Sequence, residues 1–191
     1  MIRQDMLSKM LIVLALMFSV YLATFETTTL VLFPAFLIVF GLVMEIWMEK
    51  KEEVADIQPQ SWKTIGFWTL IALGGIFLTG FTINYSQFFS MSLVSAVSYT
   101  AVSAIGEEQF FRGFITDFMV SRVPNEILGV LASAGIFTMY HLARYGLNPD
   151  AMLYTLAGGF ILSWVAWKSR RISPCMLAHL INNVVAVLGG I

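Results

Sequence analysis

Long apolar runs alternate with short polar stretches along the whole chain. A helix needs about 20 apolar residues to cross a hydrocarbon core of about 30 Å, and seven runs meet or approach this length. They are Met10–Phe25, Thr28–Met48, Lys63–Ile83, Phe88–Val120, Asn125–Arg144, Asp150–Trp167 and Pro174–Leu188. The fourth run is longer than one span requires, and its last third is amphipathic. The pattern predicts an all-α, polytopic transmembrane helix bundle of about seven helices, forming one domain over residues 1–191.

Composition and charge agree with a membrane protein. The chain is 58% hydrophobic and 12% charged, and its mean hydropathy is +0.80, whereas about 25% of the residues in a soluble domain are charged. The net charge of -1 gives no reason to expect a nucleic-acid partner. The single cysteine, Cys175, excludes an internal disulfide. The main partner is therefore expected to be the lipid bilayer.

The positive charges predict a topology. Lysine and arginine gather at alternate ends of the apolar runs, and such residues favour the cytoplasmic side of a membrane. An integral, multi-pass protein with a cytoplasmic N-terminus and an outward C-terminus follows, if the count of seven is correct. The charged segment Glu49–Lys63 is expected to be a solvated loop.

Three charged residues, Glu107, Glu108 and Arg112, lie deep in the fourth apolar run. An ionisable side chain within a membrane costs about 2.5–3.5 kcal/mol on insertion scales, so it needs a partner or a function. Glu108 and Arg112 are four residues apart, so on a helix they share a face and can form an ion pair. Glu107 is rotated by about 100° from Glu108 and points elsewhere. Glu107 therefore needs a different polar neighbour.

The two histidines of the chain are candidates for that neighbour. Glu107 lies 16 residues before a turn near Val123, and His141 lies 18 residues after it. In an antiparallel helical hairpin the two residues then differ in depth by about 3 Å. This requires the tip of the hairpin to project into the cytoplasm. His179 lies about eight residues, or roughly 12 Å, from the turn that precedes the last apolar run, which places it in the inner half of the membrane.

One asparagine shares a helix face with His179. Asn183 is four residues further along, and Asn182, three residues along, is the weaker alternative. A lone histidine between helices is ordinarily a hydrogen-bonded core residue. A carboxylate, two histidines and an asparagine that converge in apolar surroundings instead indicate a functional site.

This set can activate water. A carboxylate can act as general base while one histidine orients the water or shares the proton. A second histidine and an asparagine can donate hydrogen bonds to an oxyanion. The alternative is a zinc site with Glu107, His141 and His179 as ligands and water in the fourth position. The sequence offers no geometric test between them, although it contains neither a G-x-S-x-G nor an H-E-x-x-H motif.

Three motifs resemble those of the CPBP intramembrane proteases, the CAAX-protease and bacteriocin-processing (Abi) family, which includes the type II CAAX prenyl endopeptidases. The family pattern is E-E-x-x-x-R, F-x-x-x-H and H-x-x-x-N/D on successive helices. The matching segments here are Glu107–Arg112, Phe137–His141 and His179–Asn183. The resemblance covers residues 88–191, which it implies are the catalytic core, with the helices of residues 1–87 as accessory elements.

The resemblance also implies roles. Glu107 resembles the catalytic glutamate that activates water, with His141 assisting it. His179 and Asn183 resemble the pair that stabilises the oxyanion. The active site is then expected to open toward the cytoplasm.

The implied activity is that of a glutamate-type intramembrane endopeptidase, often labelled a metalloprotease. Glu108 and Arg112 would be supporting residues, no cofactor is favoured, and zinc is the alternative. The substrate would be a membrane-associated peptide or protein, with a prenylated CAAX-type tail as one candidate. Prenyl-protein proteases often have eight spans, and the seven expected here leave that substrate open. Two other classes compete: a non-catalytic membrane scaffold of the same fold, and a proton-relaying transporter. The gathering of polar residues in one half of the chain disfavours the transporter.

Overall fold

The computed structural model describes residues 5–25, 29–49, 61–83 and 93–189, and this part of the chain is built from helices. The helices are α1 Met6–Phe25, α2 Thr29–Glu49, α3 Trp62–Ile83, α4 Leu93–Glu108, η1 Gln109–Thr116, α5 Asp117–Arg122, α6 Glu126–Tyr145, α7 Pro149–Ser169 and α8 Ser173–Gly189. Because α4, η1 and α5 follow one another without interruption, the described residues form seven helical rods. The all-α prediction is confirmed. The expected loop at residues 50–60 and the start of the fourth run, residues 88–92, lie outside the described residues.

The turns between the last helices have clear local causes. Asn125 begins α6, because its side-chain oxygen accepts hydrogen bonds from the backbone N–H groups of Ile127 at 2.9 Å and Leu128 at 3.4 Å. Asn148 caps α7 in the same way, with a proline in the first turn. At its C-terminal end, α6 stops at Gly146 with φ 59°, a conformation that favours glycine. These signals are all readable in the sequence.

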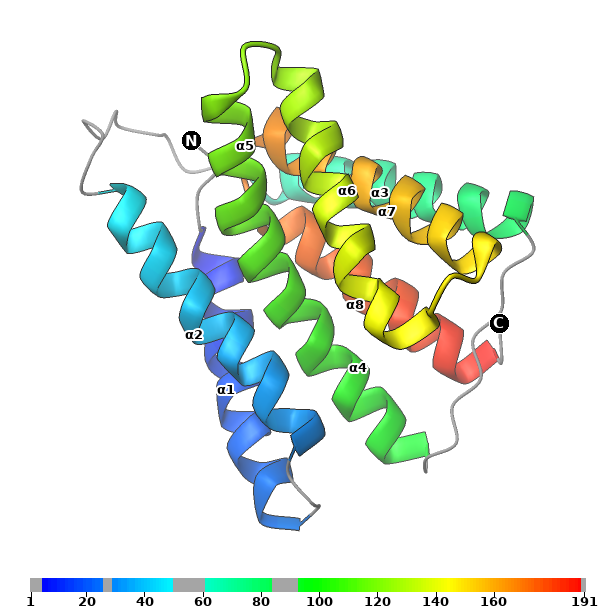
Figure 1. The fold of residues 1–191 in the computed structure, drawn as a ribbon. Coiled ribbons are helices and arrows are strands. Elements are labelled where there is room, and N and C mark those ends of the chain that lie inside the picture. Colours follow the sequence, from blue (N-terminus) through cyan, green and yellow to red (C-terminus); the bar gives the residue numbers. More distant parts are fainter. Residues whose placement is uncertain (1–4, 26–28, 50–60, 84–92, 190–191) are drawn as a thin grey trace.

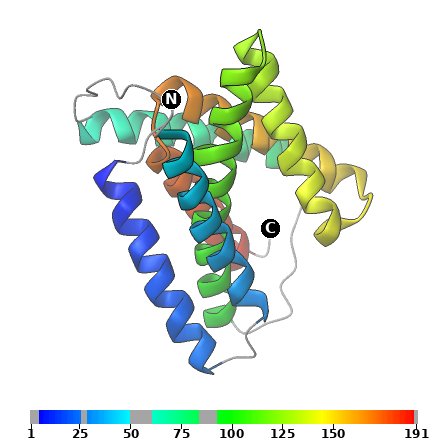
Figure 2. The same cartoon turned by 60° about the vertical axis from the view of Figure 1, so that its left-hand side comes forward.

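The long rod α4–η1–α5 lies at the centre of the bundle (Figure 1). α1 and α2 pack against it on one side and α8 packs against α4, while α6 and α7 contact η1. α3 packs against α7 and α8. Both views show the hairpin tip between α5 and α6 projecting beyond the rest of the bundle (Figures 1 and 2).

The middle of the rod departs from the α-helix that the sequence predicts. Residues Gln109–Thr116 form a π-helix, and the Thr116 hydroxyl donates to the carbonyl oxygen of Phe111, five residues earlier, at 2.9 Å. The same hydroxyl contacts Ser133 of α6 at 2.7 Å and Ser163 of α7 at 3.2 Å. Short π segments often occur at functional sites, and this one directly follows Glu107 and Glu108.

α2 holds the point at which α4 changes into the π-helix. A Cβ atom on Gly106 would lie 2.7 Å from the carbonyl oxygen of Pro34, so only glycine permits this close approach of the two backbones. One turn further along, the buried Gln109 amide donates to the buried Glu45 carboxylate at 2.8 Å. Glu45 therefore belongs to a buried polar contact.

The surface of the bundle is apolar. Large side chains such as Leu70 (70% exposed), Met17 (66%) and Phe81 (88%) point away from the protein. Such exposure is unfavourable in water and natural in lipid. Within the described residues, two helices, Trp62–Ile83 and Glu126–Tyr145, are long and apolar enough to cross a membrane.

Candidate active site

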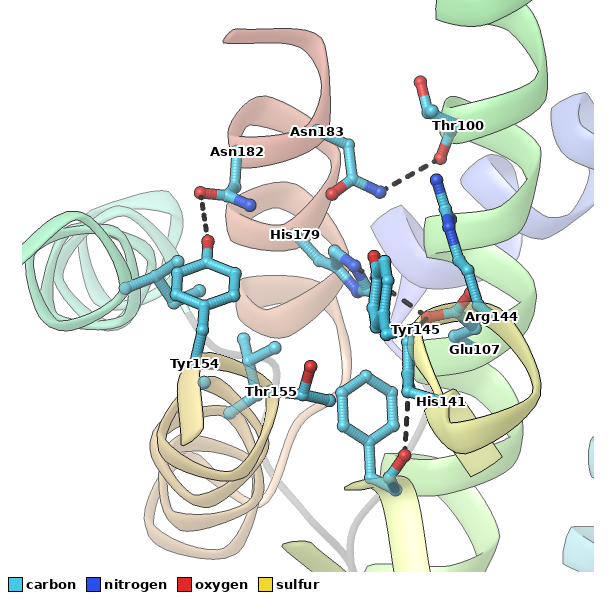
Figure 3. Close-up of a pocket in the computed structure, with 14 residues that line it drawn as sticks. Thr100, Glu107, His141, Arg144, Tyr145, Tyr154, Thr155, His179, Asn182 and Asn183 are labelled. Carbon is cyan, nitrogen blue, oxygen red and sulfur yellow. Dashed lines mark hydrogen bonds and ion pairs between the residues drawn. The ribbon is translucent and has the colours of Figure 1, made fainter. Parts of the chain in front are cut away.

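The four residues predicted to do the chemistry line one pocket (Figure 3). Glu107 comes from the end of α4, His141 from α6, and His179 and Asn183 from α8. The empty space of the pocket, open solvent included, is about 580 Å³. Three helices that are distant in sequence thus bring these side chains together, with α7 completing the wall.

The Glu107 carboxylate is held in a defined orientation. The Ser103 hydroxyl, one turn earlier on α4, donates a hydrogen bond to Oε1 at 2.7 Å. Oε2 lies 3.8 Å from Nε2 of His141 and 3.9 Å from Nε2 of His179. The side chain is almost fully buried, at 4% exposure. One oxygen is therefore fixed by Ser103, and the other faces both imidazoles.

The hydrogen bonds of the histidines define which nitrogen faces Glu107. Nδ1 of His141 lies 2.9 Å from the carbonyl oxygen of Phe137. A carbonyl oxygen can only accept, so this nitrogen carries the hydrogen, and Nε2 of the neutral ring is an acceptor. Nδ1 of His179 lies 2.7 Å from Oε1 of Glu108, and a carboxylate imposes the same arrangement. Both rings therefore direct Nε2 toward Glu107.

Glu108 and Arg112 form the ion pair that their spacing predicts. Nη1 of Arg112 lies 3.1 Å from Oε1 of Glu108, and both side chains are fully buried. The guanidinium also lies 4.1 Å from the centre of the Phe137 ring, a cation–π distance. Arg112 Nη2 is 3.5 Å from the carbonyl oxygen of Gly159, which connects the pair to α7.

The sequence did not predict the contact between His179 and Glu108. His179 was expected near Glu107, yet its closest carboxylate is Glu108. An imidazole has nitrogens on opposite sides of its ring, so it can contact both carboxylates although they point in different directions from α4. Glu108 thus links the buried Arg112 to the pocket through His179.

Both asparagines of α8 line the pocket. Asn183 donates to the carbonyl oxygen of Thr100 at 3.4 Å, and Asn182 accepts from the Tyr154 hydroxyl at 3.2 Å. Sequence reasoning missed Tyr154, for which no spacing signal exists, because α7 and α8 meet only in the tertiary structure. It also missed Ser103, although a polar residue four positions before Glu107 is a usable signal.

The zinc alternative requires three donor atoms arranged around one point. Within the described part of the chain, no group of three or more His, Cys, Asp or Glu side chains is arranged to hold a metal ion. The chemistry of the pocket is therefore derived below from its side chains alone.

The fold and the pocket define a helical protein with a buried site of two carboxylates and two histidines. The sequence model of the family described as type II CAAX prenyl endopeptidase, Rce1-like, matches residues 89–185. This match covers half of the chain, and the chain belongs to that family. The family is membrane-integral, in agreement with the apolar surface.

One curated relative is the protein YyaK of Bacillus subtilis (strain 168), described as uncharacterized. It is 28% identical over 104 residues, which are 53% of this chain and 34% of the relative. The chain thus spans about a third of the length of the relative. No solved structure matches the chain.

Proposed function

We propose that the chain is an intramembrane endopeptidase in which Glu107 activates water to cleave a peptide bond. The observation that carries this proposal is the environment of one oxygen atom. Oε2 of Glu107 faces Nε2 of His141 and of His179 at 3.8 and 3.9 Å, while Ser103 holds Oε1. Polar atoms separated by slightly more than a hydrogen bond can be bridged by water.

In the proposed reaction, Glu107 removes a proton from a bound water. Nε2 of His141 accepts a hydrogen bond from the same water and orients it, because the Phe137 carbonyl holds the hydrogen on Nδ1. The oxygen attacks the carbonyl carbon of the substrate and forms a tetrahedral intermediate. Glu107 then gives its proton to the leaving nitrogen as the C–N bond breaks, so that a carboxylic acid and an amine result.

His179 and Asn183 are proposed to bind the oxyanion of that intermediate. Asn183 has an amide donor in the pocket. Because Nδ1 of His179 points at Glu108, the ring can donate from Nε2 only when it is protonated. The Glu108 carboxylate orients the His179 ring through its contact with Nδ1, and Arg112 holds Glu108 in place. We therefore assign Glu108 and Arg112 supporting roles.

The substrate in this proposal is a membrane-associated peptide or protein, with a prenylated CAAX-type tail as the first candidate from the family description. Residues 88–191 would form the catalytic core and residues 1–87 the accessory helices. The positive-inside pattern of the sequence supports a site that opens toward the cytoplasm.

The test uses the full chain purified in detergent, with a prenylated fluorogenic CAAX-type peptide and its unprenylated counterpart. Glu107→Gln is expected to lower kcat by a factor of about 10²–10⁴ and to leave the melting temperature unchanged, because only the base is lost. Glu126→Gln is the matched control, since Glu126 is an exposed carboxylate outside the pocket. Equal cleavage by Glu107→Gln and wild type would reject the proposal. Failure of the wild type to cleave either peptide would favour the scaffold alternative.

A further inference from the structure

Two pockets meet at the proposed reaction centre. The first is the polar pocket shown in Figure 3. The second is lined by residues of α2, α4 and α6, and its wall includes three aromatic side chains. These are Phe33, Tyr99 and Tyr140. Glu107, His141 and Arg144 line both pockets. Arg144 thus accompanies Glu107 in the wall of both pockets.

Arg144 is the one permanently charged cation among the described residues that line these pockets. It follows His141 by three positions on α6, so the two side chains share a helix face. It is exposed, and its guanidinium lies 5.3 Å from the centre of the Tyr145 ring. Figure 3 shows its side chain extending past Glu107 toward Thr100 and Asn183. None of the catalytic steps above uses this charge.

We infer that Arg144 binds a carboxylate of the substrate and thereby selects where the chain is cut. The inference rests on the proposed function. A guanidinium matches a carboxylate through two parallel hydrogen bonds, and it keeps this charge at any physiological pH. A carboxylate bound there would fix the peptide in register with Glu107. Arg144 is then a specificity-determining residue.

The geometry gives the position of that carboxylate. α6 rises about 4.5 Å between His141 and Arg144, and the length of the arginine side chain adds to this separation. An extended peptide covers about 3.3–3.6 Å per residue. The carboxylate therefore lies roughly two or three residues from the bond that Glu107 attacks. A free C-terminus and an acidic side chain at that position both supply the required group.

The experiment compares three peptide substrates that differ only at the C-terminus. One has a free C-terminal carboxylate, the second a C-terminal amide, and the third an amide with glutamate as the last residue. Neutral detergent micelles are used, so that anionic lipid headgroups cannot supply the charge. Wild type is expected to cleave the free acid with a kcat/KM about tenfold above that of the neutral amide, as for a charged hydrogen bond. Cleavage of the third peptide shows whether Arg144 binds a side-chain carboxylate as well as it binds the C-terminal carboxylate.

Variants assign the preference to Arg144. Arg144→Gln is expected to slow cleavage of the free-acid peptide alone, which reduces the acid-to-amide ratio of kcat/KM to about one. Arg144→Lys is expected to retain part of the preference. Arg122→Gln is the control, because Arg122 is also an exposed arginine beside an aromatic ring but lies in α5. If Arg144 acted only through the charge of Glu107, Arg144→Gln would slow the acid and the amide equally. That result, or equal cleavage of both peptides by wild type, would overturn the inference.

Binding of the same peptides to Glu107→Gln provides a readout that needs no turnover. Arg144→Gln added to that variant is expected to weaken binding of the free acid by about tenfold and to leave binding of the amide unchanged. Equal binding of acid and amide would overturn the inference even if the catalytic proposal holds. Equal cleavage by Glu107→Gln and wild type would reject the catalytic proposal while this binding preference remained measurable.

Discussion

Replacing Arg112 by methionine removes the positive charge beside Glu108 and keeps most of the side-chain volume. Arg112 and Glu108 are both fully buried, and their closest atoms are 3.1 Å apart. After the substitution the Glu108 carboxylate keeps its contact with Nδ1 of His179, at 2.7 Å. It also removes the cation that lies 4.1 Å above Phe137. We expect this single change to destabilise the fold.

The magnitude follows from the burial of the pair. Breaking a fully buried ion pair from one side costs about 3–5 kcal/mol, because the other charge stays in a poorly solvating environment. For a chain of this length, one kcal/mol corresponds to about 2–4 °C in melting temperature. Arg112→Met should therefore melt roughly 6–20 °C below wild type.

Thermal unfolding in detergent, followed by size-exclusion chromatography of heated samples, measures this shift. Arg122→Met is the control, because Arg122 is exposed and an exposed substitution changes stability by about 0.5 kcal/mol at most. The double variant Glu108→Gln with Arg112→Met removes both charges and should recover more than half of the loss. A melting temperature for Arg112→Met equal to that of wild type would refute the assignment of Arg112 as a structural partner of Glu108.

Three further predictions concern the pocket and its support. Ser103→Ala removes the hydrogen bond to Oε1 of Glu107 and should lower kcat about tenfold or more, with a loss of stability of about 1–3 kcal/mol because a buried acceptor loses its partner. Unchanged kcat in peptide cleavage would contradict the role of Ser103. Gly106→Ala places a Cβ atom 2.7 Å from the Pro34 carbonyl oxygen and should cost about 1–3 kcal/mol. Gly66→Ala, which meets nothing within 4 Å, should not destabilise, and equal melting temperatures for the two variants would refute the close approach of α2 and α4. Treatment with a zinc chelator should leave the cleavage rate unchanged, and loss of activity that added zinc restores would revive the metal alternative.

The local features of the site were readable from the sequence because they depend on helix periodicity. The i, i+4 spacing of Glu108 and Arg112 predicted their ion pair, and the structure contains it. Depth counting along the hairpin predicted that Glu107 and His141 meet, and their closest atoms are 3.8 Å apart. Such inferences need only the rise and rotation per residue, which are nearly constant in α-helices.

Contacts between helices were harder to predict from the sequence. The hydrogen bond of His179 to Glu108 and that of Tyr154 to Asn182 depend on how α7 and α8 are rotated against their neighbours. The π-helix at Gln109–Thr116 was also missed, because apolar periodicity does not distinguish a short π-helical segment within a long run. The contact of Glu45 with Gln109 joins residues 64 positions apart and could not be derived from spacing.

The sequence by itself determined that this protein is a transmembrane helix bundle. It also determined which polar residues lie at a similar depth along the helices. Burial of an unpaired charge is costly, so a charged side chain within an apolar run needs a partner or a function. Only the tertiary structure decided which nitrogen faces which carboxylate and which walls enclose Glu107. Those features depend on rotations and distances between helices, and close backbone approaches such as that of Gly106 to Pro34 accompany them.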